Sequence, residues 1–454
     1  MRVENYHSDT LHIDCFAPGK NEAWCIYGSN RSGIDSFIGL LAGESEGKNR
    51  KYSDKTAVIT FAGQQELFEE ELRRDNSDYL DRLDPGTPAH AFIKHPEKHN
   101  DLIHAFDLQN CMEKGYRQLS SGESRKLLLL SALSRNPENL IIETPYDGID
   151  RQGCRELDRI LAELVNHGLR MLVTAGNRKD IPQWCSHLAI LHDGRLLFQG
   201  TRQETLRRYE ASGHADSSPQ LRLQTNQKTA PPAANELIRL RNGFARYGDI
   251  EIFHGLDLTV ATGQHTLLTG PNGSGKSTLL QIISGDNQNC YANDLCIFGR
   301  KRGSGESIWE LKCKMGIVSP DLHRNHYIPG NPMQVVLSGL FDSIGVYRQY
   351  TSAQKQQALS WLEMLGLQDK AYQPFRRLSY AEQRLCLIGR ALIKMPCLLI
   401  LDEPTQGLDQ GNRDSLLDFL ETIAGKNLST ILYASHRSDE YRSFFRQHID
   451  LAIL

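Results

Sequence analysis

The sequence lacks any long apolar run. Its strongest apolar stretches, KLLLLSAL and CLLIL, are far shorter than the roughly 18 residues needed to cross a bilayer. The N-terminal stretch MRVENYHSDTLHIDCF carries charges where a secretory signal needs an apolar core, so we expect no export. If the protein acts at a membrane, we therefore expect it to bind at the membrane surface and not to cross the bilayer.

The sequence also lacks an excess of charge of one sign and closely paired cysteines. Its 52 basic and 55 acidic residues leave a net charge of −3, so no specific nucleic-acid partner is expected. Ten cysteines occur without a C-x-x-C pair, which argues against a zinc site or a disulfide framework. We expect a cytoplasmic chain with reduced cysteines, and its 454 residues predict two or three domains.

What is present is a complete phosphate-binding loop, G-x-x-x-x-G-K-[ST], within HTLLTGPNGSGKSTLLQIISG. An apolar strand precedes it and a helix with apolar residues at helical spacing follows it, which is the context that this motif requires. Backbone N–H groups and the helix dipole cradle the phosphates, while the lysine reaches the outer phosphates and the hydroxyl holds Mg²⁺. The predicted nucleotide-binding residues are Gly270, Pro271, Asn272, Gly273, Ser274, Gly275, Lys276, Ser277 and Thr278.

Two acids and a histidine follow further along the chain. CLLILDEPTQGLD is a buried strand that ends in Asp402, which would hold Mg²⁺ together with Ser277, and Glu403, which would orient or deprotonate the attacking water. LYASH ends at His436, which is placed to sense the γ-phosphate. Taken alone, His436 would more readily be an ordinary surface histidine, but its place after the loop and the acids favours a catalytic role.

The order of this loop, LSYAEQR, the acidic strand and ASH resembles the nucleotide-binding domain of ABC ATPases, whose signature is L-S-G-G-Q. The resemblance implies an α/β P-loop fold, hydrolysis of ATP, and ATP and Mg²⁺ as ligands. It also assigns Tyr247, which precedes the loop, to stacking on the adenine ring, with a role in the core as the alternative.

The first half of the chain repeats these motifs in altered form. LSSGESRK begins at Leu119 and LSYAEQRL at Leu378, an offset of 259 residues, and Glu143 and Asn177 align with the second acidic strand and histidine at this same offset. The loop GSNRSGIDS, at an offset of 242, has the frame of a phosphate loop and keeps Gly28, Gly33 and Ser36. We interpret the chain as an internal duplication with 17 more residues between loop and signature in the second copy.

The first copy has lost the residues that carry the chemistry. Ile34 replaces the lysine, Thr144 replaces the catalytic glutamate, and Asn177 stands at the histidine position. Asp35 adds a negative charge that would repel a phosphate about 4 Å away by about 4 kcal/mol at an effective dielectric near 20. Arg31 could replace part of the missing positive charge. We expect that the first copy does not hydrolyse ATP by itself.

The signature LSSGE nevertheless survives in the first copy. In ABC ATPases two domains pack head to tail, so the resemblance implies that the intact loop faces Ser120, Gly122 and Glu123 of the first copy. The degenerate loop would face LSYAE, where Tyr380 and Ala381 replace the signature glycines. The defects would then gather in one composite site and leave the other complete.

One element of the family pattern is missing from the second copy. The glutamine that usually follows the next strand is absent from MGIVSPDLH, where Ser319 and Pro320 stand, while VITFAGQQELF in the first copy offers Gln64 or Gln65.

We therefore predict two tandem ABC-type P-loop ATPase domains, residues 1–205 and 236–454, that pack on each other. The stretch between them, residues 206–235, is polar, contains Ser and Pro, and lacks helical periodicity, so it is predicted to be a flexible linker.

The tract NDLCIFGRKRGSGESIWELKCKMGIVSPDLH, with VVLSGLFDSIGVYRQY, closely resembles tandem ABC-type ATP-binding proteins associated with molybdate transport loci. That resemblance implies a cytoplasmic ATPase, or one held at the cytoplasmic face of the inner membrane, that serves a separate permease. Two alternatives stay open: a soluble ATPase acting on ribosomes or nucleic acid, and a regulator that binds ATP as a switch. The ribosome-acting tandem family carries a long charged helical linker and two intact sites, and neither feature is seen in this sequence.

Overall fold

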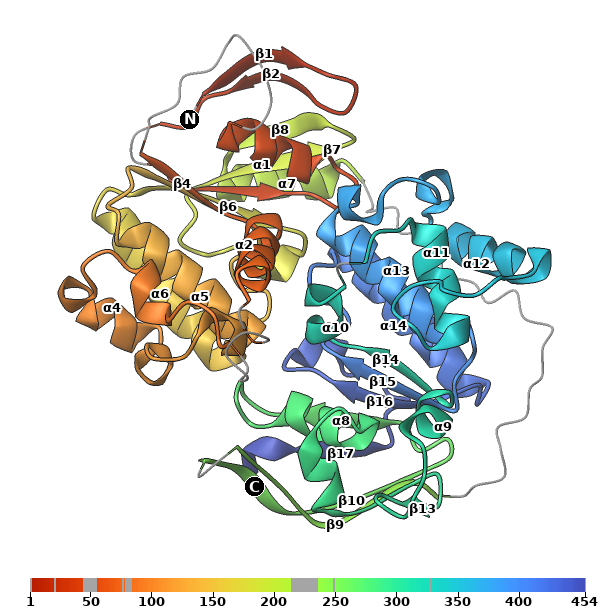
Figure 1. The fold of residues 1–454 in the computed structure, drawn as a ribbon. Helices are drawn as coiled ribbons and strands as arrows, with labels where there is room; N and C mark the ends of the chain where they lie inside the picture. Colours follow the sequence, from red (N-terminus) through yellow and green to blue (C-terminus); the bar gives the residue numbers. More distant parts are fainter. Residues whose placement is uncertain are drawn as a thin grey trace. The chain divides into compact units, whose positions relative to one another are not determined.

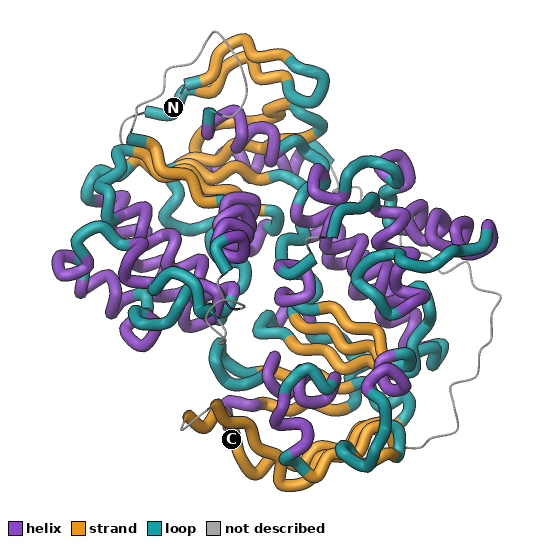
Figure 2. Tube along the Cα trace, in the orientation of Figure 1, coloured by secondary structure: helices purple, strands orange, loops and turns teal. Residues whose placement is uncertain are grey.

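The computed structural model describes residues 2–19, 22–43, 55–75, 77, 84–213, 236–247, 250–326 and 328–453. The chain divides into two compact units, made mainly of residues 1–217 and of residues 218–454. Each unit has an α/β fold, with helices packed against strands (Figures 1 and 2). Among the described residues, no helix combines the length and the apolar character needed to span a membrane.

The first unit is built on one eight-stranded sheet with the strand order β1-β2-β8-β7-β3-β6-β5-β4. Its strands are β1 (Val3–His7), β2 (His12–Phe16), β3 (Trp24–Tyr27), β4 (Thr56–Ile59), β5 (Asn139–Ile142), β6 (Arg170–Ala175), β7 (His187–His192) and β8 (Arg195–Thr201). Its helices are α1 (Ile34–Ala42), α2 (Phe61–Arg73), α4 (Asn100–Ala105), α5 (Ser121–Leu133), α6 (Arg151–Asn166) and α7 (Arg202–Ala211).

The second unit contains a five-stranded parallel sheet, β14-β15-β16-β11-β17, and a four-stranded antiparallel sheet, β10-β9-β12-β13. Its strands are β9 (Glu236–Tyr247), β10 (Ile250–Ala261), β11 (Thr266–Thr269), β12 (Asp294–Ile297), β13 (Arg300–Lys301), β14 (Met315–Val318), β15 (Leu398–Asp402), β16 (Thr430–Ala434) and β17 (Gln447–Asp450). Its helices are α8 (Lys276–Ser284), α9 (Ile308–Lys312), α10 (Pro320–Arg324), α11 (Pro332–Ser338), α12 (Ser352–Met364), α13 (Tyr380–Leu392) and α14 (Gln410–Gly425).

The same five strands recur in the same order in both units. The order β4-β5-β6-β3-β7 in the first unit corresponds to β14-β15-β16-β11-β17 in the second. Strands β5 and β15, which lie inside these sheets, are largely apolar because both of their faces are covered, and every residue of each is buried. Loops at the carboxyl ends of β11, β15 and β16 carry the predicted site, where ligands usually bind in parallel sheets.

Two further features concern the residues between the shared elements. In the second unit β12, β13 and α9 lie between α8 and β14, where the second copy has its additional residues, and β12 pairs with β9.

Residues 206–211, which we assigned to the linker, form the end of helix α7, because the chain continues in helical conformation to Ala211. Residues 214–235 of the predicted linker lie outside the described residues.

Candidate functional site

The phosphate loop of the second unit connects β11 to α8. Gly275 caps the helix in the left-handed conformation, with φ of 90°, and Lys276 is the first helical residue. A Cβ atom at Gly275 would lie 2.8 Å from side-chain atoms of Ile252 and Phe253, so only glycine fits there. The strand, loop and helix that the sequence predicts are thus all present.

Lys276 is buried against the loop itself. Its Nζ donates hydrogen bonds to the carbonyl oxygens of Gly270 and Pro271, each at 2.8 Å. The ammonium group is therefore held beside the loop backbone, whose N–H groups would receive phosphate.

Asp402, the last residue of β15, is a buried carboxylate with spare bonding capacity. Its Oδ1 has no hydrogen-bond partner among the described residues. Burial, followed by the charge of Glu403, raises the pKa of Asp402 to about 7, and a hydrogen bond from Ser277 opposes that rise. A carboxylate oxygen and a hydroxyl side by side are ligands that Mg²⁺ accepts, so Asp402 and Ser277 fit the predicted metal.

Glu403 and His436 form a directly bonded pair. The Nδ1 of His436 lies 2.8 Å from the Oε1 of Glu403. Burial would raise the pKa of Glu403, but the hydrogen bond and charge of His436, then Lys276 and Arg384, hold it below its usual value. Burial would lower the pKa of His436, but Glu403 raises it. Each partner thus favours the charged form of the other, and the carboxylate of Glu403 can accept a proton from water.

An arginine that follows the signature fixes the acidic turn. The buried guanidinium of Arg384 donates to the carbonyl oxygens of Asp402 at 3.0 Å and Glu403 at 2.6 Å. Glu403 has φ of 44°, a left-handed conformation that costs of order 1–3 kcal/mol when it is imposed on a residue other than glycine. In the first unit Arg125 donates in the same way to the carbonyl oxygens of Glu143 and Thr144. Sequence reasoning missed these arginines, although both stand at the same place after their signatures.

The degenerate loop of the first unit keeps the backbone form of the intact one. Gly33 caps α1 in the left-handed conformation, again with φ of 90°. Ile34 is buried at the position of the lysine, whereas Asp35 and Ser36 are exposed in the first turn of the helix. Gly28 directly follows β3, so the frame of the motif is retained without its cation.

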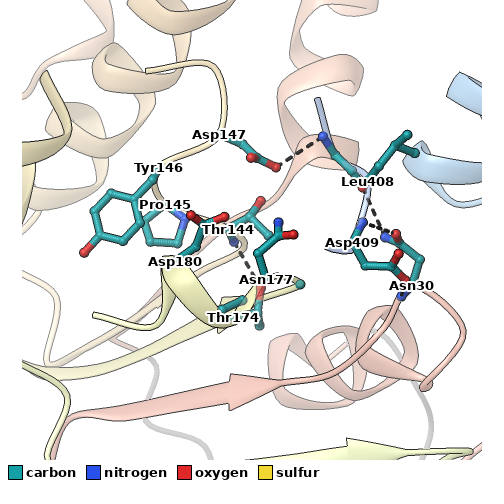
Figure 3. Close-up of a pocket in the computed structure, with 13 residues that line it drawn as sticks. Asn30, Thr144, Pro145, Tyr146, Asp147, Thr174, Asn177, Asp180, Leu408 and Asp409 are labelled. Atoms are coloured by element: carbon teal, nitrogen blue, oxygen red, sulfur yellow. Dashed lines mark hydrogen bonds between the residues drawn. The ribbon is translucent and has the colours of Figure 1, made fainter. Parts of the chain in front are cut away.

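The acidic turn of the first unit also keeps its backbone form. Thr144 stands where Glu403 stands in the second unit and has φ of 38°. Its backbone N–H donates to Thr174 Oγ1 at 3.0 Å (Figure 3). This part of the site therefore retains the strained turn without the carboxylate.

The structure corrects the alignment of Asn177 with His436. In the first unit Ile142 pairs with Val173, whereas in the second Leu401 pairs with Tyr433, an offset of 260 for the last strand rather than 259. The short helices that follow, Arg178–Asp180 and Ser438–Glu440, show the same offset and are preceded by Asn177 and Arg437. The structural counterpart of His436 is therefore Gly176, because the second copy has one extra residue before β16. A γ-phosphate sensor is missing from the first copy on either alignment.

Glu143 gives a prediction for the dependence of stability on pH. Burial, followed by the charge of Asp35, raises the pKa of Glu143 to about 7. The native state then binds a proton that the unfolded state releases, so stability should fall as the pH rises from about 4.5 to about 7. Glu143→Gln, which keeps an acceptor for the backbone N–H of Phe61, should raise the free energy of unfolding at pH 8 by about 1–3 kcal/mol.

Urea unfolding of the wild type and Glu143→Gln at pH 5 and pH 8 checks this prediction. Glu113→Gln is the control, because Glu113 is exposed. An equal gain at both pH values, or no gain at pH 8, would contradict the assignment.

The two signatures have the same local structure. Ser120 caps α5 and Ser379 caps α13, each in a capping box with the glutamate three residues later, Glu123 or Glu382. Gly122 is buried in the first turn of α5, while Ser120 is exposed. The serines are thus matched in local structure and differ in their neighbours, which are Ser121 and Gly122 in one unit and Tyr380 and Ala381 in the other.

The structure describes the backbone of the predicted adenine-stacking residue but not its side chain. Tyr247 is the last residue of β9. Its side chain lies outside what the structure describes, so its role stays a prediction.

Comparison with known proteins agrees with the motifs. The family model described as ABC transporter matches residues 253–406. The chain is 34% identical to the ABC transporter ATP-binding protein ModF of Escherichia coli K12, over 95% of this chain and 91% of that protein. It is 28% identical to an uncharacterized ABC transporter ATP-binding protein of Schizosaccharomyces pombe, over 76% of this chain and 70% of that protein.

Solved structures share the tandem fold at low sequence identity. A structure of ribosome-bound archaeal Pelota and ABCE1 is similar with a TM-score of 0.63 and 16% identity, covering 96% of this chain and 73% of that chain. Archaeal ABCE1 in complex with the ribosomal stalk protein aP1 is similar with a TM-score of 0.56 and 17% identity, covering 96% and 84%. These likenesses concern the fold.

Proposed function

Because the chain belongs to the ATP-binding proteins of the ABC transporter family and is an ATPase, we propose that it hydrolyses ATP at residues 270–278, Asp402, Glu403 and His436 of the second unit. The observation that carries the proposal is the Glu403–His436 pair, in which the imidazole lies 2.8 Å from a buried carboxylate and holds the pKa of that carboxylate below its usual value. The equivalent places in the first unit hold Thr144 and Gly176.

The second unit supplies the groups that bind the phosphates, hold the metal and activate the water. The loop N–H groups and Lys276 bind the phosphates, and Ser277 and Asp402 would hold Mg²⁺, which neutralises charge on the phosphates when bound. Glu403 takes a proton from the attacking water, and His436 fixes the orientation of its carboxylate and faces the developing charge. Tyr247 would stack on the adenine.

The first unit contributes its signature rather than a second hydrolytic site. We assign Ser120, Gly122 and Glu123 to the ATP held by the second loop, since the family packs its two domains head to tail. The retained glycine at 122 and the Tyr380 and Ala381 replacements in the other signature support this crossed arrangement.

The crossed arrangement is tested by two matched substitutions. Ser120→Arg should lower the steady-state ATPase rate at least about tenfold, because arginine at the signature prevents closure around the γ-phosphate. Ser379→Arg should stay within about twofold of the wild type, because it would face only the degenerate loop. Both variants lose an equivalent helix cap, which costs about 1 kcal/mol, so they control for each other in stability. Equal losses, or a greater loss in Ser379→Arg, would refute the arrangement.

We further propose that the protein is the cytoplasmic ATPase of a molybdate-type transport system, held peripherally at the inner membrane by a separate permease. The whole-chain similarity to ModF supports this role. Affinity purification of the Glu403→Gln protein from membranes with ATP, followed by mass spectrometry, should recover a multispanning permease. Recovery of ribosomal proteins alone would favour the alternative, a non-transport ATPase acting on ribosomes. Recovery of neither would favour an ATP-dependent regulator.

A further inference from the structure

The short helix α10 of the second unit follows β14 and is bonded to two helices of the site, α8 and α13. The carbonyl oxygen of Ser319, which caps α10, accepts from Arg384 at 2.9 Å. Asp321 accepts at 3.1 Å from Gln281 of α8, the helix that begins at Lys276. The Nε2 of His323 lies 3.1 Å from Gln383 Oε1 on the signature helix α13. This small helix thus connects the phosphate-loop helix to the signature helix, whose Arg384 in turn holds the acidic turn.

The bond between His323 and Gln383 has a defined direction. Gln383 Nε2 donates to the carbonyl oxygen of Leu378 at 3.0 Å, so its Oε1 is the acceptor and His323 Nε2 is the donor. His323 is buried, and burial followed by the charge of Arg384 lowers its pKa to about 3, so the ring is neutral. The ring also stacks on Tyr380, with centroids 4.3 Å apart. His323 is therefore fixed on both its edge and its face.

The residue that His323 holds is next to the arginine that fixes the catalytic turn. Gln383 and Arg384 are consecutive in the first turns of α13. Arg384 donates to the carbonyl oxygens of Asp402, Glu403 and Pro404. Because Glu403 is held in a left-handed conformation, its carboxylate depends on these backbone contacts for its position.

The first unit makes the same connection with different side chains. Gln64 of α2 donates to Ser124 Oγ at 2.6 Å and to the carbonyl oxygen of Ser121 at 3.1 Å. At the offset of 259 residues, Gln64 corresponds to His323 and Ser124 corresponds to Gln383. Ser121 corresponds to Tyr380. The pair Gln64–Ser124 in one unit is thus His323–Gln383 in the other, and both members of the pair differ between the units.

We propose that His323 is a positioning residue for ATP hydrolysis, which through Gln383 and Arg384 holds the acidic turn so that the Glu403 carboxylate faces the attacking water. The inference rests on the proposed function in one respect, the assignment of Glu403 as the base.

The test exchanges one pair for the other. His323→Leu and Gln383→Ser should each lower kcat about tenfold, while the KM for ATP stays within about twofold, because the phosphate loop is untouched. The double variant His323→Gln/Gln383→Ser recreates the Gln64–Ser124 pair and should recover kcat to within about threefold of the wild type. His326→Leu is the matched control, because His326 is buried three residues away and neither ring nitrogen has a hydrogen-bond partner among the described residues.

The outcomes separate this inference from the proposed function. An unchanged kcat in His323→Leu, a change in KM alone, or a double variant no better than its worse single variant would overturn the positioning role. Glu403→Gln is measured beside them: normal hydrolysis in that variant would instead overturn the assignment of the base. Should a single variant not fold, recovery in the double variant still decides the question, with thermal unfolding as the check.

Discussion

Replacing Glu403 by glutamine is expected to lower the steady-state ATPase rate at least a hundredfold and to leave ATP binding intact. General bases contribute about 10²–10⁴-fold, and glutamine keeps the size of the side chain while it removes the charge that accepts the proton. The bond from His436 is lost or reversed in this variant, but the loop and Lys276 are unchanged. ATPase assays with a fluorescent ATP-binding titration measure both effects.

Thr144→Gln is the matched control for Glu403→Gln. It places the same side chain at the equivalent left-handed position of the first unit, where φ is 38°. Its ATPase rate should stay within about twofold of the wild type, since no base is removed. A wild-type rate in Glu403→Gln would show that the base lies elsewhere.

Replacing Lys276 by alanine is expected to weaken ATP binding about a hundredfold or more, which corresponds to about 3 kcal/mol. The ammonium is the main positive charge at the loop, and charge-assisted hydrogen bonds to phosphate are roughly twice as strong as neutral ones. Equilibrium titration of ATP with Mg²⁺ present measures the affinity, and circular dichroism verifies the fold.

Ile34→Met is the control for Lys276→Ala, because Ile34 is the buried counterpart in the first loop and methionine has a similar volume. It should leave the affinity for ATP unchanged. If Ile34→Met weakened binding as much as Lys276→Ala, the first loop would be a nucleotide site after all.

The sequence predicts the strand, loop and helix around Lys276 because glycine spacing and apolar runs are local signals. The duplication is equally visible, since the motifs of both copies keep their order. Register is less visible: a single extra residue before β16 moves the counterpart of His436 from Asn177 to Gly176. The pairing of neighbouring strands and the short helices that follow them reveal this shift.

The connection through His323 was not predictable from the sequence for a different reason. His323 and Gln383 are 60 residues apart, and the pair resembles Gln64–Ser124 in position but not in residue type. The sequence of this region shows only that the glutamine of the family pattern is absent from MGIVSPDLH. The correspondence between the two pairs becomes visible when the side chains that contact α13 in the second unit are compared with those that contact α5 in the first.

The left-handed turn at Thr144 shows that the backbone of the first unit is retained where its side chains differ from those of the second. A β-branched residue in that conformation is strained, and Thr144 has no carboxylate that could act as a base there. The turn nevertheless persists because Arg125 and the adjoining strands β4 and β5 hold its backbone, so that relaxing it would disturb several elements at once. Side chains, by contrast, change one at a time. The first unit therefore keeps the backbone of the acidic turn although threonine stands at the position of the glutamate.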